Sequence, residues 1–148
     1  MTKHTLLKLN KICTVLFYPA FGLLLLGLWL RRPEELLPTV LICGISFVLL
    51  SAYRHWRNAP RPYETDPTIE PPTPHCRRGH SFPSRHVFSA WLITMAFLFH
   101  CPGLGLLLMI PATALAYLRQ KLHFHHKRDV LWGAALGILC GLLGFSLC

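Results

Sequence analysis

Residues 118–129 read LRQKLHFHHKRD and separate two apolar runs of the chain. Five residues lie between Arg119 and His125, and three lie between His125 and Asp129. If the second half of the stretch is helical, His125 and Asp129 share one helix face. A carboxylate there can fix the imidazole tautomer and leave the other ring nitrogen free for nucleophilic attack. The alternative is a basic loop beside a membrane helix, in which Asp129 only caps the next helix.

The apolar residues around this stretch predict a membrane protein. Of the 148 residues, 53% are hydrophobic and 14% are charged, whereas soluble domains have about 25% charged residues. The apolar residues form blocks without amphipathic spacing, and the length suits a single domain, residues 1–148. We expect an all-α polytopic membrane helical bundle with about five spans, near residues 13–30, 37–53, 86–101, 104–118 and 130–148.

The net charge of +9 comes mainly from basic residues between the apolar blocks. Lipid phosphates and lipid headgroups are therefore the expected partners, and nucleic acid is not, because no nucleic-acid-binding signature is present. The six cysteines include no Cys-x-x-Cys pair, which argues against a disulfide framework and a thiolate zinc site.

Five spans place the N-terminus and both polar loops on one side of the membrane. The loop at 54–85 holds seven of the twelve prolines, so a helix through residues 59–74 is implausible and we expect an extended loop. The active-site loops should thus share one membrane face.

The stretch RHWRNAPRP, residues 54–62, supplies two guanidinium groups. Arg54 lies at the end of the second span, where its stem can stay in apolar surroundings. Arg61 lies between prolines and loses less entropy when it binds an anion. Alternatively, both arginines are ordinary flanking charges of a membrane helix.

The stretch HSFPSRH, residues 80–86, precedes the third span. Pro83 and Ser84 predict a helix start with Ser84 as the N-cap, and helix N-termini bind phosphate through free N–H groups. Arg85 adds charge, and His86 in the first turn could protonate a leaving group. Alternatively, the segment only starts the helix and His86 is interfacial.

Taken together, the three stretches read Arg-(six)-Arg-Pro, Pro-Ser-Arg-His and Arg-(five)-His-(three)-Asp. This order resembles the type-2 phosphatidic acid phosphatase family, which includes integral-membrane lipid phosphate phosphatases, bacterial acid phosphatases and vanadium haloperoxidases. The resemblance covers residues 54–129, about half of the chain.

The resemblance implies a catalytic set and a phosphate-binding set. His125 would be the nucleophile that forms a phosphohistidine, Asp129 would orient it, and His86 would protonate the leaving group and then activate water. The groups that would contact the phosphate are Arg54, Arg61, Arg119, the hydroxyl of Ser84 and the backbone at Arg85.

Three positions depart from the family pattern. Arg54 replaces a lysine, which keeps the charge and changes its shape. Arg85 replaces a glycine and Leu118 replaces a serine. The extra guanidinium of Arg85 favours a highly charged headgroup such as a diphosphate.

Two rival functions use the same residues differently. A metal site could draw on the histidines and a cysteine near the motifs, but paired acidic ligands are missing; its candidates are His75, Cys76, His80, His123, His125 and His126. A non-enzymatic lipid-binding or transport protein could use the basic pocket alone. The His125–Asp129 pair and His86 argue against this reading, because binding phosphate needs no nucleophile.

The sequence therefore predicts a lipid phosphate or diphosphate phosphatase that needs no metal and no cofactor. Undecaprenyl diphosphate is the favoured substrate, and phosphatidylglycerophosphate and phosphatidic acid are the alternatives. We expect a multi-pass protein of the cell membrane. Its active site should face the cytoplasm, because the side that holds the motifs carries most of the basic residues.

Overall fold

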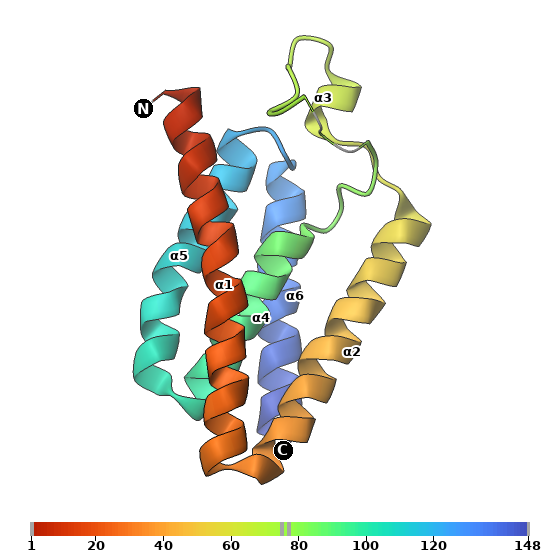
Figure 1. Cartoon of the computed structure of the whole chain (residues 1–148). Coiled ribbons are helices and arrows are strands. Elements are labelled where there is room, and N and C mark those ends of the chain that lie inside the picture. Colours follow the sequence, from red (N-terminus) through yellow and green to blue (C-terminus); the bar gives the residue numbers. More distant parts are fainter. Residues whose placement is uncertain (1, 75, 77, 148) are drawn as a thin grey trace.

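The computed structural model describes residues 2–74, 76 and 78–147, which form a helical bundle without a strand in that part of the chain (Figure 1). A single helical turn, α3 at Pro62–Thr65, interrupts the connection between the second and third long helices. The long helices are α1 at Lys3–Arg31, α2 at Pro33–Arg57, α4 at Arg85–His100, α5 at Pro102–Lys121 and α6 at Lys127–Ser146. The all-α membrane bundle predicted from the sequence is confirmed.

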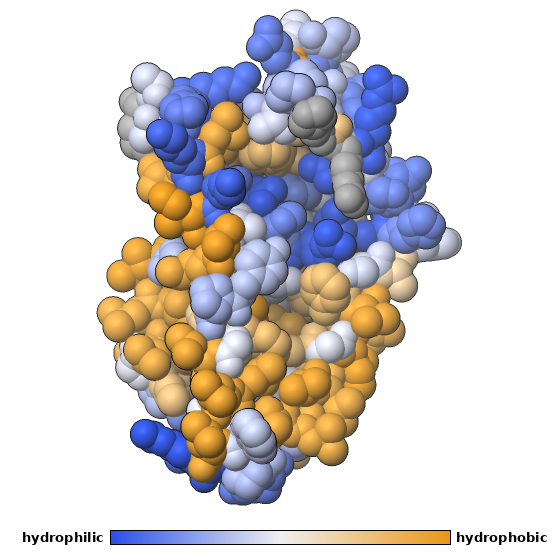
Figure 2. All heavy atoms as spheres, viewed as in Figure 1, coloured by the Kyte–Doolittle hydropathy of each residue, from blue (hydrophilic) through white to orange (hydrophobic). Residues whose placement is uncertain are grey.

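Each expected span coincides with one long helix, but the bounds differ. The first helix begins at Lys3, well before the expected start at residue 13. The last expected residue, 148, lies outside the described residues. By length and composition, α1, α2, α5 and α6 can each cross a membrane. The chain is thus a multi-pass membrane protein, whose exposed leucines and valines form an apolar band below a hydrophilic end (Figure 2).

The exception among the long helices is α4, which has only 16 residues. It is the central helix of the bundle and contacts the other four. Its buried residues are Val87, Phe88, Ala90, Leu92, Thr94, Met95, Ala96 and Phe97. Because its neighbours cover it, α4 does not need the length of a lipid-exposed span.

Three glycines of α6 let that helix approach α4 closely. Gly133, Gly137 and Gly141 are spaced by four residues and lie on one face. A Cβ atom on Gly137 would lie 2.6 Å from the carbonyl oxygen of Phe88, and one on Gly133 would lie 2.7 Å from that of Ser84. Both neighbours are backbone atoms that cannot move aside, so the glycines fix the distance between the two helices.

The polar segments gather at one end of the bundle. The start of α1, the 58–84 connection with α3, and the α5–α6 loop lie together there (Figure 1). The expectation that no helix forms within residues 59–74 is wrong at one turn. Pro62 occupies the first position of α3, and the Glu64 carboxylate accepts the Arg61 N–H at 2.8 Å, which caps that turn.

A polar cluster joins two helices at the opposite end. The ring of His100, at the end of α4, lies 2.8 Å from the Glu35 carboxylate and 3.0 Å from the Thr39 hydroxyl. Thr39 is almost fully buried, and its hydroxyl also donates to the Glu35 carbonyl at 2.8 Å. The cluster ties the start of α2 to α4 without any residue of the predicted site.

Candidate active site

A cavity of about 270 Å³ lies at the polar end of the bundle. The side chains that line it are Arg54, Arg61, Thr73, Cys76, Arg85, His86, Arg119, Phe124 and His125. Six of the eight residues predicted from the sequence are among them. The other two, Ser84 and Asp129, are fully buried nearby and contact each other through a hydrogen bond from the Ser84 N–H to the Asp129 carbonyl at 2.8 Å.

His125 does not lie on a helix, so the condition under which it would share a helix face with Asp129 is not met. Helix α6 begins at Lys127, and His126 is its N-cap. The reason is the Asp129 carboxylate, whose Oδ2 accepts the His126 N–H at 3.1 Å and caps the first turn. The two residues still meet, because His125 Nδ1 and Asp129 Oδ2 are 3.8 Å apart.

His125 is buried and uncharged at neutral pH. Its side chain is 2% exposed, and the backbone N–H of His125 donates to the Arg119 carbonyl at 3.3 Å. Burial, with a smaller contribution from nearby arginines, lowers the pKa of His125 to about 4, while Asp129 acts in the opposite direction. A neutral imidazole keeps a lone pair for attack, as a nucleophile requires.

The start of α4 positions two predicted residues, Ser84 beside the cavity and His86 in its lining. Ser84 is the N-cap by position, as expected, but its hydroxyl makes no capping hydrogen bond. That hydroxyl is buried and has no hydrogen-bond partner among the described residues. His86 is the second residue of the helix and lines the cavity.

Arg54 and Arg61 hold the loops that surround the cavity. The guanidinium of Arg54 donates to the carbonyl oxygens of His80, Ser81 and Pro83. Arg61 donates to the carbonyls of Gly79 at 3.1 Å and Phe124 at 3.2 Å. A guanidinium has five N–H donors, so both side chains can fix backbone and still face an anion.

Arg119 is positioned from two directions. Its Nη2 donates to the Thr14 hydroxyl at 3.3 Å, and its guanidinium carbon lies 4.9 Å from the centre of the Phe124 ring. Its Nε is buried without a hydrogen-bond partner among the described residues. A buried donor of this kind favours an acceptor such as a phosphate oxygen in the cavity.

Several residues at the site were not singled out from the sequence. Ser81 touches both His125 and Asp129, while Thr73 lines the cavity from the 58–84 connection, beside Cys76, which the sequence offered only as a metal ligand. The position of Ser81 inside HSFPSRH was the only signal for Ser81, and Thr73 had none. Among the described residues, no group of three His, Cys, Asp or Glu side chains could hold a metal ion; His75 lies outside the described residues.

The chain is similar to a family and to two solved membrane proteins. The model of the PAP2 superfamily matches residues 58–147. The crystal structure of Aquifex aeolicus LpxE is 25% identical, with a TM-score of 0.69 over 97% of this chain and 93% of that one. The crystal structure of a transmembrane PAP2-type phosphatidylglycerolphosphate phosphatase from Bacillus subtilis has the same fold. It is 21% identical, with a TM-score of 0.72 over 98% of this chain and 75% of that one. No curated protein matches the chain.

Proposed function

The chain belongs to the PAP2 superfamily, and we propose that it is a membrane lipid phosphatase that acts through a phosphohistidine on His125. The observation that carries the proposal is the convergence of two histidines and four arginines on one cavity. A non-enzymatic lipid-binding protein would need the arginines but not a buried neutral histidine beside an aspartate.

The first step transfers the phosphoryl group to the enzyme. The Nε2 atom of His125 attacks phosphorus and forms an N–P bond, while the P–O bond to the leaving group breaks. His86 gives its proton to the leaving oxygen, either an alcohol or, from a diphosphate, a phosphate. Arg61 and Arg119 stabilise the charge on the equatorial oxygens, which is the main contribution of a protein to phosphoryl transfer.

The second step releases orthophosphate. His86, now neutral, accepts a proton from water as the water oxygen bonds to phosphorus. The N–P bond breaks and returns its electron pair to His125. His86 is then protonated again, so both histidines regain their starting states.

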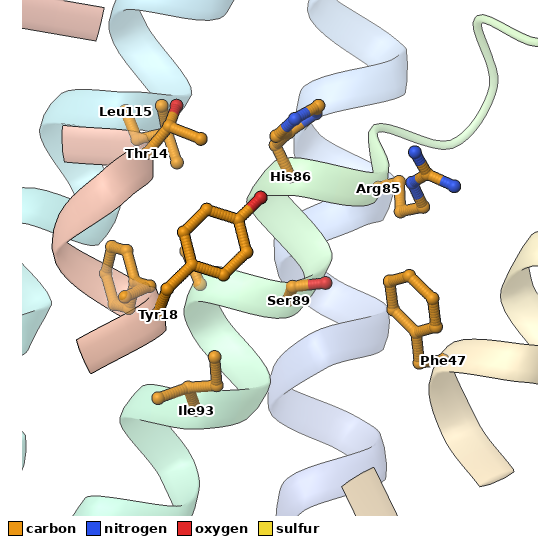
Figure 3. A pocket seen from close by; sticks show the side chains of 10 residues that line it. Thr14, Tyr18, Phe47, Arg85, His86, Ser89, Ile93 and Leu115 are labelled. Carbon is orange, nitrogen blue, oxygen red and sulfur yellow. The ribbon is translucent and has the colours of Figure 1, made fainter. Parts of the chain in front are cut away.

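A second cavity supports a lipid as the substrate. This cavity, of about 190 Å³, shares Arg85 and His86 with the first and continues between α1, α2 and α4 (Figure 3). Phe47, Ile93 and Leu115 contribute apolar walls, and Tyr18 projects from α1 toward α4. Because the proposed acid His86 lies at the junction, the leaving group and its hydrocarbon chain would extend into this second cavity.

The lipid itself is proposed at two levels. The general class is a lipid phosphate monoester or diphosphate. Within it we favour undecaprenyl diphosphate, because Arg85 adds a cation where the second phosphate would lie. Its guanidinium is 5.5 Å from the centre of the Phe47 ring, at the junction of the two cavities.

The test is phosphate release by the purified protein in detergent micelles. The panel contains undecaprenyl diphosphate, phosphatidylglycerophosphate, phosphatidic acid and a short-chain soluble phosphate. We expect release from at least one lipid, with His125→Ala losing roughly 10³-fold or more of the rate. His123→Ala and His126→Ala are the matched controls, because neither side chain lines the cavity.

Two additions to the assay separate the rival functions. We expect activity to persist in EDTA, because the arginines supply the positive charge, and vanadate to inhibit by binding opposite His125. Loss of turnover in EDTA that a divalent cation restores would favour the metal site. Lipid binding without phosphate release from any substrate would favour the transport or binding protein.

A further inference from the structure

The nucleophile and its orienting acid do not touch directly. His125 Nδ1 and Asp129 Oδ2 are 3.8 Å apart, which is too far for a hydrogen bond. The hydroxyl of Ser81 is within reach of both atoms. Its Oγ lies 2.5 Å from Asp129 Oδ2 and 3.4 Å from His125 Nδ1.

The single proton of a hydroxyl decides the direction of these bonds. An ionised carboxylate can only accept, so Ser81 donates to Asp129. The Ser81 oxygen then has lone pairs but no second proton, so it must accept from Nδ1–H of His125. A neutral imidazole that carries its proton on Nδ1 has a free lone pair on Nε2, the atom proposed to attack.

The backbone holds Ser81 in this position from both sides. Its N–H donates to the Ala59 carbonyl at 2.8 Å, and its own carbonyl accepts from Arg54 at 3.3 Å. The residue is fully buried. The hydroxyl is therefore preorganised by the same connection that carries Arg61 and leads into the start of α4.

We propose that Ser81 is a positioning residue that relays the orientation of His125 to Asp129, through the chain Nδ1–H to Oγ and Oγ–H to Oδ2. The proposal rests on the proposed function, in which His125 is the nucleophile. When Nε2 bonds to phosphorus, the ring becomes cationic and the two hydrogen bonds strengthen. No proton has to move along the chain.

Kinetics of the full-length protein in micelles form the first test. Ser81→Ala removes the relay, and Ser81→Cys keeps its approximate size with a weak donor. Both should lower kcat by roughly 10- to 100-fold and leave KM within about twofold. Ser51→Ala is the control, because the Ser51 hydroxyl on α2 has no hydrogen-bond partner among the described residues and does not line the cavity.

A double variant separates a relay from general damage to the fold. If Ser81 acts through Asp129, Ser81→Ala should lower the rate of Asp129→Asn by less than about threefold. Losses that multiply, or a kcat within about twofold of wild type in both single variants, would overturn the relay.

A third measurement does not depend on turnover. In protein labelled with ¹⁵N-histidine, NMR in micelles should place the His125 proton on Nδ1, and Ser81→Ala should shift population to Nε2. An unchanged tautomer overturns the relay. If wild type releases no phosphate from any lipid, the proposed function fails, and the tautomer measurement still decides whether Ser81 orients His125.

Discussion

Arg119 illustrates how one side chain can be both fixed and free to bind. Thr14 and Phe124 hold two sides of its guanidinium, and Nε remains without a partner among the described residues. Lysine would keep the positive charge but would lose the planar fork that can meet both Thr14 and a phosphate oxygen. Shape as well as charge should therefore matter at this position.

We predict that Arg119→Lys lowers kcat/KM by about 100-fold, because one preorganised donor to the transition state is lost. The variant should fold normally, since the ammonium can remain at the polar end of the bundle. Arg57→Lys is the matched control, because Arg57 is exposed and does not line the cavity. Equal kcat/KM values for the two variants would exclude a direct role for the guanidinium.

At the scale of single residues, the sequence predicted those site residues that lie in short motifs with fixed spacing. Spacing, together with the family resemblance that it carries, singled out His125, Asp129 and Arg119, because these residues keep fixed intervals along the chain. It could not identify Ser81 or Thr14. Their roles depend on contacts with residues 44 and 105 positions away, and no local pattern encodes such contacts.

At the scale of elements, the contact between α4 and α6 positions the site. The three glycines of α6 bring its backbone against α4, so the N-terminus of α4 lies beside Asp129. Without a hydrophobic driving force between helices in lipid, close van der Waals contact is a principal source of their association. The glycine spacing should thus set stability and site geometry together.

We predict that Gly137→Ala destabilises the bundle by about 1–3 kcal/mol, because the new methyl group would overlap the Phe88 carbonyl. The midpoint of thermal unfolding in detergent should fall. Gly27→Ala, on α1, has no atom within 4 Å of its added methyl group and should not lower the midpoint. A midpoint unchanged in both variants would contradict the proposed role of the close contact.

The helices were predictable in number and order, but their ends were not. Apolar blocks located the five long helices, whereas the start of α6 depended on the Asp129 carboxylate capping His126. The one-turn helix α3 depended similarly on Glu64. Caps are side-chain contacts, and hydropathy cannot place them.

At the scale of the whole molecule, the two ends of the helical bundle differ in charge. The end with the cavity carries Lys3, Lys8 and Lys11 on α1, close to the membrane, while the opposite turn carries Arg31 and Arg32 with Glu34 and Glu35. Basic residues near a span favour the cytoplasmic side. We therefore predict that the active site faces the cytoplasm.

Two single-cysteine proteins test this orientation. In a background with all native cysteines replaced, Glu70→Cys reports on the cavity end, and native Cys101, restored alone, reports on the opposite turn. Both positions are exposed. In intact cells, a membrane-impermeant maleimide should label Cys101 and not Glu70→Cys. The reverse pattern would place the active site outside.

The double use of the Asp129 carboxylate has a thermodynamic consequence. The same oxygen, Oδ2, caps the first turn of α6 and accepts the hydroxyl of Ser81. Fraying of that turn would release the aspartate and disorganise His125 in the same opening event, long before the glycine contacts further along α6 separate. Activity should therefore be lost under milder heat or denaturant than global unfolding requires, because a local opening is sufficient. Amide hydrogens deeper in α6 should still be protected from exchange under those conditions.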